Sequence, residues 1–222
     1  NRLNRLNRLR VGVLRSRKIL WGLSLFGYLL FSFWYTNTSG PLSASEVEHY
    51  LSKAQALGGS DEALRRLRSF LQSDSGNQFL MVNNIDMNET PGDVAGSQPG
   101  ESSDQIMDRY MEHMYPALFT RASHPIFFGN AVHTSLDVVG IQNAEVWDRA
   151  AVVRYRSRRD LMDITTNPAF AGKHHFKLAA LTKTIAYPVE SQLYLSDPRF
   201  LLALIILCIT ALSDIVVFGR RR

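Results

Sequence analysis

The stretch Phe79–Met87, FLMVNNIDM, decides how the middle of the chain folds, because an apolar run this short predicts a buried strand. Residues 88–103 follow as a polar segment rich in Gly, Pro and Ser, which predicts a loop. Ser102 and Gln105 then have the spacing of a capping box, which starts a helix. Apolar residues recur at helical spacing as far as Phe119, so a helix is expected to follow the strand.

Strand and helix continue to alternate toward the C-terminus. The predicted elements are strands over 126–135, 146–156 and 184–189, and a helical region that starts at Ser157, is interrupted near Asn167-Pro168 and resumes through His175 to Leu181. The order is β-α-β-β-α-β, so we expect an α+β domain of the ferredoxin-like type over residues 79–190. Two helices cover one face of such a sheet, and the other face is left open and commonly needs a partner.

Short motifs spread over the same range carry a family resemblance. They are Tyr115-Pro116, Phe128-Gly129-Asn130, WDRAAVVRY over 147–155, SRRDLM over 157–162, Asn167-Pro168-Ala169-Phe170, and TIAYPVE over 184–190. Through them, residues 79–190 resemble a family of small bacterial proteins of uncharacterised function with the dimeric α/β-barrel form of the ferredoxin-like fold. The resemblance implies that two copies pair through their open sheet faces. It implies no reaction, although cofactor-independent monooxygenases and haem-handling enzymes belong to the same superfamily.

Two apolar runs flank this domain. The runs over 19–35 and 200–219 contain a single charged residue, Asp214. A helix needs about 20 residues to cross a hydrocarbon core of about 30 Å. We therefore predict transmembrane helices over 19–36 and 199–219. For the first, an uncleaved anchor is favoured over a signal peptide, because no small-x-small cleavage site follows its long apolar run.

Basic residues gather outside the two runs. The segment 1–18 contains no acid and ends with Arg15, Arg17 and Lys18, and the chain closes with Arg220, Arg221 and Arg222. Positively charged flanks stay on the cytoplasmic side, so we expect 1–18 to be a basic cytoplasmic tail and both termini to be cytoplasmic. The middle would then lie in the periplasm, carried by a two-pass protein of the bacterial inner membrane. Acids outnumber bases between the runs, so no nucleic-acid partner is expected.

Asp214 is an acid inside the second apolar run. One interpretation is a contact with a partner or an ion path, since ionisable groups inside a bilayer are costly and often functional. The favoured interpretation is an acid near the interface that is neutralised by the terminal arginines. Cys208 in the same run is the only cysteine, which excludes an intrachain disulfide and a zinc site built from cysteines.

Residues 43–73 predict a helical hairpin before the domain. Ser43 and Glu46 have capping-box spacing, Gly58-Gly59 end the first helix, and Ser60 begins the second. We expect this hairpin to act as a stalk or as a cap on the ferredoxin-like domain.

Histidines are the candidates for ligand chemistry. His113, His124 and His133 fall on a predicted helix end, turn and strand, and His113 or His133 would line the cleft between sheet and helices as a haem ligand or base. No acid or cysteine at ligand spacing accompanies them. His174 and His175 point about 100° apart on a helix, so they cannot easily bind one metal together. With Lys173 and Lys177 beside them, they are expected to lie on a solvated helix face. We therefore predict no catalytic, cofactor or metal site.

Two charged groups each have two interpretations. Asp104, Asp108 and Glu112 share one helix face, which is either a cation or partner site or a solvated surface. Four arginines at a strand–helix junction either bind an anion or balance neighbouring acids. They are Arg154, Arg156, Arg158 and Arg159.

These patterns favour a non-catalytic accessory subunit. Two anchors would hold a pairing-prone domain at the membrane surface, where its sheet face or hairpin docks another copy or a larger membrane complex, such as a respiratory or photosynthetic one. The alternative is a membrane-tethered enzyme, or a small-ligand or haem binder, that uses the cleft of the α/β barrel. No Ser-His-Asp pattern, phosphate-binding loop or nucleotide fingerprint is found in the sequence.

Overall fold

The computed structural model of the chain describes residues 2–219, with the side chains of 11–169 and 172–219. The chain forms two compact units. One unit joins the two ends, residues 1–36 and 193–222, and the other holds the middle, residues 37–192. The predicted hairpin over 43–73 and the predicted domain over 79–190 therefore belong to one compact unit.

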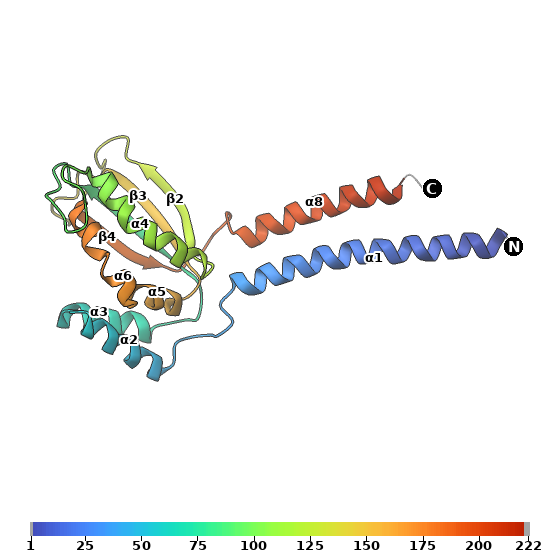
Figure 1. The fold of residues 1–222 in the computed structure, drawn as a ribbon, viewed down its shortest axis with the longest axis horizontal. Helices are drawn as coiled ribbons and strands as arrows, with labels where there is room; N and C mark the ends of the chain where they lie inside the picture. The colour runs from blue at the N-terminus through green and yellow to red at the C-terminus, as the bar shows by residue number, and fades with distance from the viewer. Residues whose placement is uncertain (1, 220–222) are drawn as a thin grey trace. The chain divides into compact units, whose positions relative to one another are not determined.

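Four antiparallel strands form the sheet of the middle unit (Figure 1). They are β1 (Phe79–Met87), β2 (His124–Asn130), β3 (Arg149–Tyr155) and β4 (Leu181–Val189), in the spatial order β2-β3-β1-β4. Helix α4 (Ser103–Phe119) follows β1, and α5 (Arg158–Thr165), α6 (Pro168–Ala171) and α7 (His174–Ala179) follow β3. The prediction of a ferredoxin-like α+β fold is confirmed.

The strand boundaries differ from the predicted ones beside the longest loop of the sheet. β2 ends at Asn130 instead of 135, and β3 begins at Arg149 instead of 146. Asn130 and Arg149 are the last pair of this ladder, and 131–148 is a loop. β4 begins at Leu181 instead of 184, because Leu181 still pairs with Met87 beyond an irregularity in the ladder.

Helices α4 and α5 cover one face of the sheet and close the main core. Phe79 of β1 and Tyr155 of β3 stack with ring centroids 5.3 Å apart. They pack with Leu118 of α4 and Ile164 of α5, all nearly free of solvent contact. Alternate residues of a strand point to the same side, so Phe79 determines which residues of β1 face the helices.

The predicted hairpin is present and packs on α5. Its helices are α2 (Ala44–Ala56) and α3 (Asp61–Gln72), which begin at the side-chain caps Ser43 and Ser60. Leu71 of α3 is fully buried in a cluster that includes Met162 of α5. The Tyr50 hydroxyl of α2 donates to Asp163 Oδ1 at 2.7 Å. The hairpin is therefore a cap on the ferredoxin-like domain.

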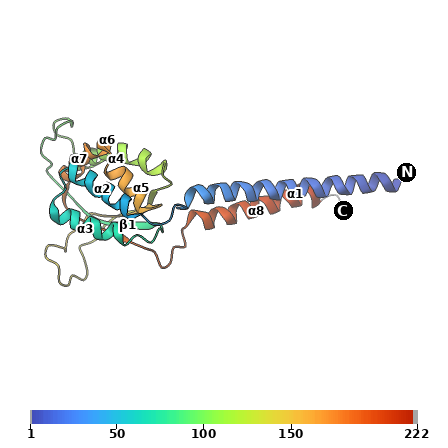
Figure 2. The ribbon, with the colours of Figure 1, turned by 90° about the horizontal axis from the view of Figure 1, so that it is seen from below.

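The unit of the two chain ends consists of α1 (Arg2–Tyr35) and α8 (Pro198–Phe218), which lie side by side and antiparallel (Figures 1 and 2). Among the described helices, α8 is the one that is long and apolar enough to cross a membrane. The backbone of α1 runs without a break through most of the predicted tail 1–18 and the predicted membrane segment 19–36. A crossing by 19–36 stays a prediction.

Candidate functional site

Strand residues that point away from α4 and α5 form the open face of the sheet. We define it as Leu80, Val82, Phe127, Val152, Ile185, Tyr187 and Val189. In the strand register, Val82 lies opposite Val152 on one side and opposite Tyr187 on the other, and Val152 lies opposite Phe127. Neighbours in register interact directly across strands, so these four side chains form an apolar row over the whole width of the sheet.

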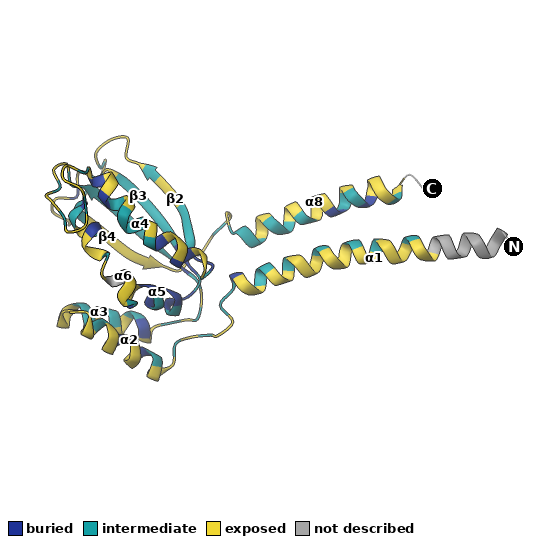
Figure 3. Ribbon diagram, viewed as in Figure 1, coloured by how far each residue is buried: buried dark blue, intermediate teal, exposed yellow. Residues whose placement is uncertain are grey.

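The open face is exposed on its outer strands β2 and β4 and partly buried on β1 and β3. Phe127 is 53% and Tyr187 47% exposed, whereas Phe79 and Tyr155 on the covered face are 1% and 6% exposed. Figure 3 shows β4 exposed along most of its length. Exposed apolar patches of this kind are typical of docking sites.

Polar groups border the open face at both ends. At one end, Lys183 Nζ lies 3.5 Å from Asp86 Oδ2 and 4.9 Å from the centroid of the Trp147 ring. At the other end, the buried Arg154 guanidinium donates through Nε to Gln78 Oε1 at 2.9 Å. An apolar centre with polar margins is the usual anatomy of a protein interface.

Sequence reasoning did not identify this row of residues as a site. Its members come from four strands that are separated by long loops and helices, so no local motif contains them. A partial signal lies in β4, where Ile185, Tyr187 and Val189 recur at every second position. This alternation predicts a strand with one apolar face, but not which side of the sheet that face takes.

The two predicted cleft histidines lie in different kinds of structure. His113 is partly buried on α4, and His133 is exposed in the loop 131–148 rather than in a strand. The Nδ1 atom of His133 is 3.2 Å from the carbonyl oxygen of Thr134, its neighbour in sequence. Among the side chains that the structure describes, no three His, Cys, Asp or Glu residues are grouped to hold a metal ion. A ligand role for His113 or His133 stays a prediction.

The arginines that follow β3 form ion pairs with acids. This agrees with the interpretation that these arginines balance neighbouring acids. The pairs are Arg156 with Asp160, Arg158 with Asp74 and Glu190, and Arg159 with Glu46. The hydrogen bond from Arg159, followed by the one from the Ser43 backbone, lowers the pKa of Glu46 to about 2. The Arg159 pair therefore links the hairpin to α5 electrostatically.

The other predicted charged faces also serve internal contacts. Asp104 at the start of α4 pairs with Arg149 of β3, and this hydrogen bond lowers the pKa of Asp104. His174 and His175 are both exposed, as expected. The Nε2 atom of His175 lies 3.0 Å from the carbonyl oxygen of Ala95, so this ring also contacts the loop after β1.

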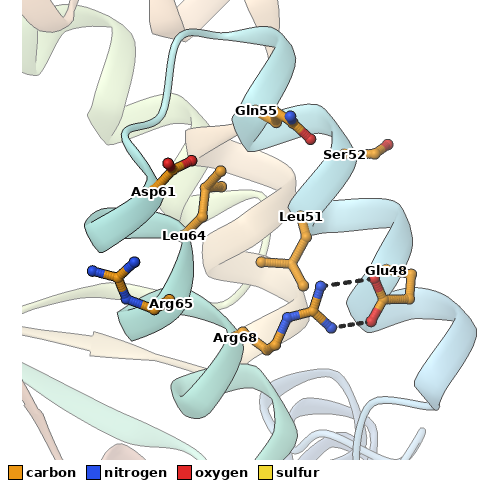
Figure 4. A pocket seen from close by; sticks show the side chains of 8 residues that line it. All are labelled: Glu48, Leu51, Ser52, Gln55, Asp61, Leu64, Arg65 and Arg68. Atoms are coloured by element: carbon orange, nitrogen blue, oxygen red, sulfur yellow. Dashed lines mark hydrogen bonds and ion pairs between the residues drawn. The ribbon is translucent and has the colours of Figure 1, made fainter.

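A shallow groove of about 370 Å³ lies between α2 and α3 (Figure 4). Leu51 and Leu64 supply its apolar wall. Arg68 makes two hydrogen bonds to the carboxylate of Glu48, which Figure 4 shows as dashed lines. The groove makes the hairpin a second candidate docking surface, in which Arg68 and Glu48 at the rim pair with each other.

Polar side chains link α1 to α8. Arg17 forms an ion pair with Asp214, with Nε 2.7 Å from Oδ1, and the Thr210 hydroxyl donates to Ser24 Oγ at 2.7 Å. The arginine beside Asp214 thus comes from the opposite end of the chain. The arginines that the sequence suggested as its partners, Arg220, Arg221 and Arg222, lie outside the described residues.

The fold and its open face place the middle unit in the class of ferredoxin-like α+β domains. A protein of unknown function from Rhodopseudomonas palustris is similar to it, with 15% identity, 62% of this chain and 98% of that chain covered, and a TM-score of 0.47. No family model matches the chain, and no curated protein matches it.

Two further solved structures are described as dimeric. One is a protein of unknown function and ferredoxin-like fold from Bacteroides fragilis, with 11% identity, 51% of this chain and 96% of that chain covered, and a TM-score of 0.30. The other is a ferredoxin-like protein of unknown function from Jannaschia, with 14% identity, 52% of this chain and 100% of that chain covered, and a TM-score of 0.30. The predicted resemblance to uncharacterised dimeric ferredoxin-like proteins is confirmed, and at these identities it concerns the fold.

Proposed function

We propose that this protein is a non-catalytic, membrane-anchored accessory subunit whose ferredoxin-like domain docks through the open face of its sheet. Its first partner is a second copy of the chain, and the resulting homodimer organises a larger membrane complex. The apolar row of Phe127, Val152, Val82 and Tyr187, exposed at its two ends and partly buried between them, is the observation that carries this proposal.

The row favours a second sheet as the partner because it spans all four strands. A groove would suit a helix or a peptide, whereas a four-stranded apolar surface buries most area against another sheet, with side chains of the two faces interdigitating. The dimeric description of two structures with this fold is compatible with such pairing. Exposed aromatic side chains lose much contact with water when they are covered, and they dominate the energetics of interfaces.

The anchor proposed for the domain is a pair of membrane-spanning helices. The length and apolarity of α8 support one crossing. Large exposed apolar residues on α1, such as Leu23, Phe26 and Leu30, support a second crossing beside it. With the basic flanks of both helices in the cytoplasm, the domain lies in the periplasm of a bacterium and the protein spans the inner membrane twice.

The experiment that tests the proposal is a mass measurement of the full chain after gentle detergent extraction, by light scattering that separates protein from detergent. We expect a dimer. Tyr187→Glu and Phe127→Glu each place an unpaired carboxylate at one end of the apolar row, where it would be covered in the dimer, which is strongly unfavourable. Each variant is expected to shift the protein to monomer at concentrations where the unmodified chain is dimeric.

Tyr115→Glu is the matched control, because Tyr115 is 43% exposed but lies on α4. This variant should stay dimeric. A wild-type monomer would contradict the proposed pairing, and so would equal dissociation of the Tyr115 and Tyr187 variants. Proteins that co-purify with the wild type and are lost with Tyr187→Glu would identify the larger complex.

A further inference from the structure

The groove between α2 and α3 is lined by one face of each helix (Figure 4). Its residues recur three or four positions apart, which is the spacing of neighbours on one side of a helix. They include Leu51 and Gln55 of α2, and Asp61, Leu64 and Arg65 of α3. The hairpin packs on α5, which covers the other side of the sheet from the open face. The groove is therefore a surface separate from the open face.

The charges of the groove cancel. Two acids and two arginines line it, and of these Arg68 and Glu48 pair with each other. The remaining two, Asp61 and Arg65, are exposed, and no ion pair among the described side chains includes either of them. A groove without net charge offers no overall attraction to a nucleic acid, an acidic peptide or an anionic membrane surface. A partner that suits it must present charges of both signs.

The positions of these two charges make the groove complementary to itself. Asp61 and Arg65 lie one turn apart on α3, with Leu64 on the same side of the helix. A two-fold interface uses the same patch on both copies, so that each contact occurs twice. When α3 of a second copy lies antiparallel to the first, Asp61 of each copy faces Arg65 of the other, and the two Leu64 side chains meet between these pairs.

The form of the groove also suits a helix as its occupant. A furrow between neighbouring helices accepts the side-chain ridge of another helix. Leu51 is 6% exposed and Leu64 is partly buried, so the wall that this ridge would contact is apolar. Two hairpins joined in this way form a four-helix arrangement. Because its apolar area is small, the contact is expected to be weaker than the pairing of two open sheet faces.

We propose that the groove of the α2–α3 hairpin is a second self-association site, at which the hairpins of two copies pack together and Asp61 and Arg65 pair reciprocally. This contact is separate from the open face and goes beyond the dimer proposed above. A chain with two self-complementary surfaces joins dimers into larger assemblies. Confinement of the chains in a membrane raises their effective concentration, so a weak contact is sufficient for this role.

Sedimentation of the purified full chain carrying Tyr187→Glu, in mild detergent, isolates this contact, because Tyr187→Glu removes pairing through the open face. We expect self-association with a dissociation constant of about 0.1 to 1 mM. Arg65→Asp or Asp61→Arg, each added to Tyr187→Glu, should weaken it at least about fivefold, because like charges then face each other. An equimolar mixture of these two chains should associate as tightly as the parent, since two acids then face two arginines.

The matched control is Arg66→Asp, which makes the same change one position along α3 at a residue that does not line the groove. It should leave self-association unchanged. Asp61 lies in the first turn of α3, where an acid is favourable, so the melting temperature of each variant is measured as a check on folding. If Asp61→Arg fails to fold, the contrast between Arg65→Asp and Arg66→Asp decides alone.

Three results would overturn the proposal. They are no self-association at about 1 mM, equal self-association of the Arg65→Asp and Arg66→Asp chains, and a mixture of the two charge reversals that stays as weak as either one. A co-purifying protein that is lost with Arg65→Asp while self-association is unaltered would assign the groove to that protein instead. Failure of the open-face pairing gives a different result, because Tyr187→Glu would then leave the mass unchanged while the charge reversals still test the groove.

Discussion

The carboxylate of Glu46 connects the hairpin to the domain through Arg159, with Oε1 2.7 Å from the guanidinium Nε. This carboxylate also accepts from the backbone N–H of Ser43, so it caps α2 as well. Its folded pKa of about 2 lies below the ordinary value of 4.5. Folding therefore favours the ionised form, and the resulting stabilisation is present above about pH 4.5 and is lost as the pH falls through about 2.

Glu46→Gln should accordingly lower stability near neutral pH and have little effect in strong acid. The side chain is partly exposed and screened by solvent, so we expect a cost of about 1 kcal/mol or less. The measurement is the urea midpoint of the variant against wild type at neutral pH and at about pH 2.

Glu62→Gln serves as the comparison, because Glu62 pairs with Arg66 on the fully solvated side of α3. Its effect should not exceed about 0.5 kcal/mol at any pH. Equal destabilisation by Glu46→Gln at both pH values would contradict the role of the carboxylate charge.

At the scale of elements, the packing of the hairpin on the domain is stabilised more by one buried leucine than by the hairpin's charged side chains. Leu71 of α3 has no exposed surface and shares a cluster with Met162 of α5. Leu71→Ala leaves a cavity at this contact, so the free energy of unfolding should fall by about 2 to 5 kcal/mol. The control is Leu57→Ala at the C-terminal end of α2. The Leu57 side chain is 45% exposed, so this change should alter the free energy of unfolding little. A small effect of Leu71→Ala in urea denaturation would mean that the hairpin is not part of the folded core.

The element order could be predicted from the sequence because its signals are local. The capping boxes at Ser43 and Ser102 begin α2 and α4 where expected, since each depends on residues only three positions apart. The end of β2 could not be predicted, because it depends on the pairing of Asn130 with Arg149 across a long loop. The same reason hid the apolar row of the open face, whose members meet only through strand register.

At the scale of the whole molecule, the proposed topology predicts which parts of the chain are reachable from outside. In spheroplasts that carry the chain with a peptide tag at each terminus, added protease should digest the middle domain and spare both tags. In the proposed topology both ends lie in the cytoplasm, the side that arginine- and lysine-rich flanks favour. Removal of one tag in intact spheroplasts would contradict the two-pass arrangement, and release of an intact soluble domain without protease would contradict the anchors.

The ion pair between Arg17 and Asp214 joins residues 197 positions apart, and this separation has a consequence for biogenesis. A ribosome exposes Arg17 long before Asp214, because the whole middle domain lies between them in the sequence. The middle can therefore fold before α8 arrives to neutralise the arginine and to offer Thr210 to Ser24. The pairing of α1 with α8 is thus a late step in the synthesis of this protein.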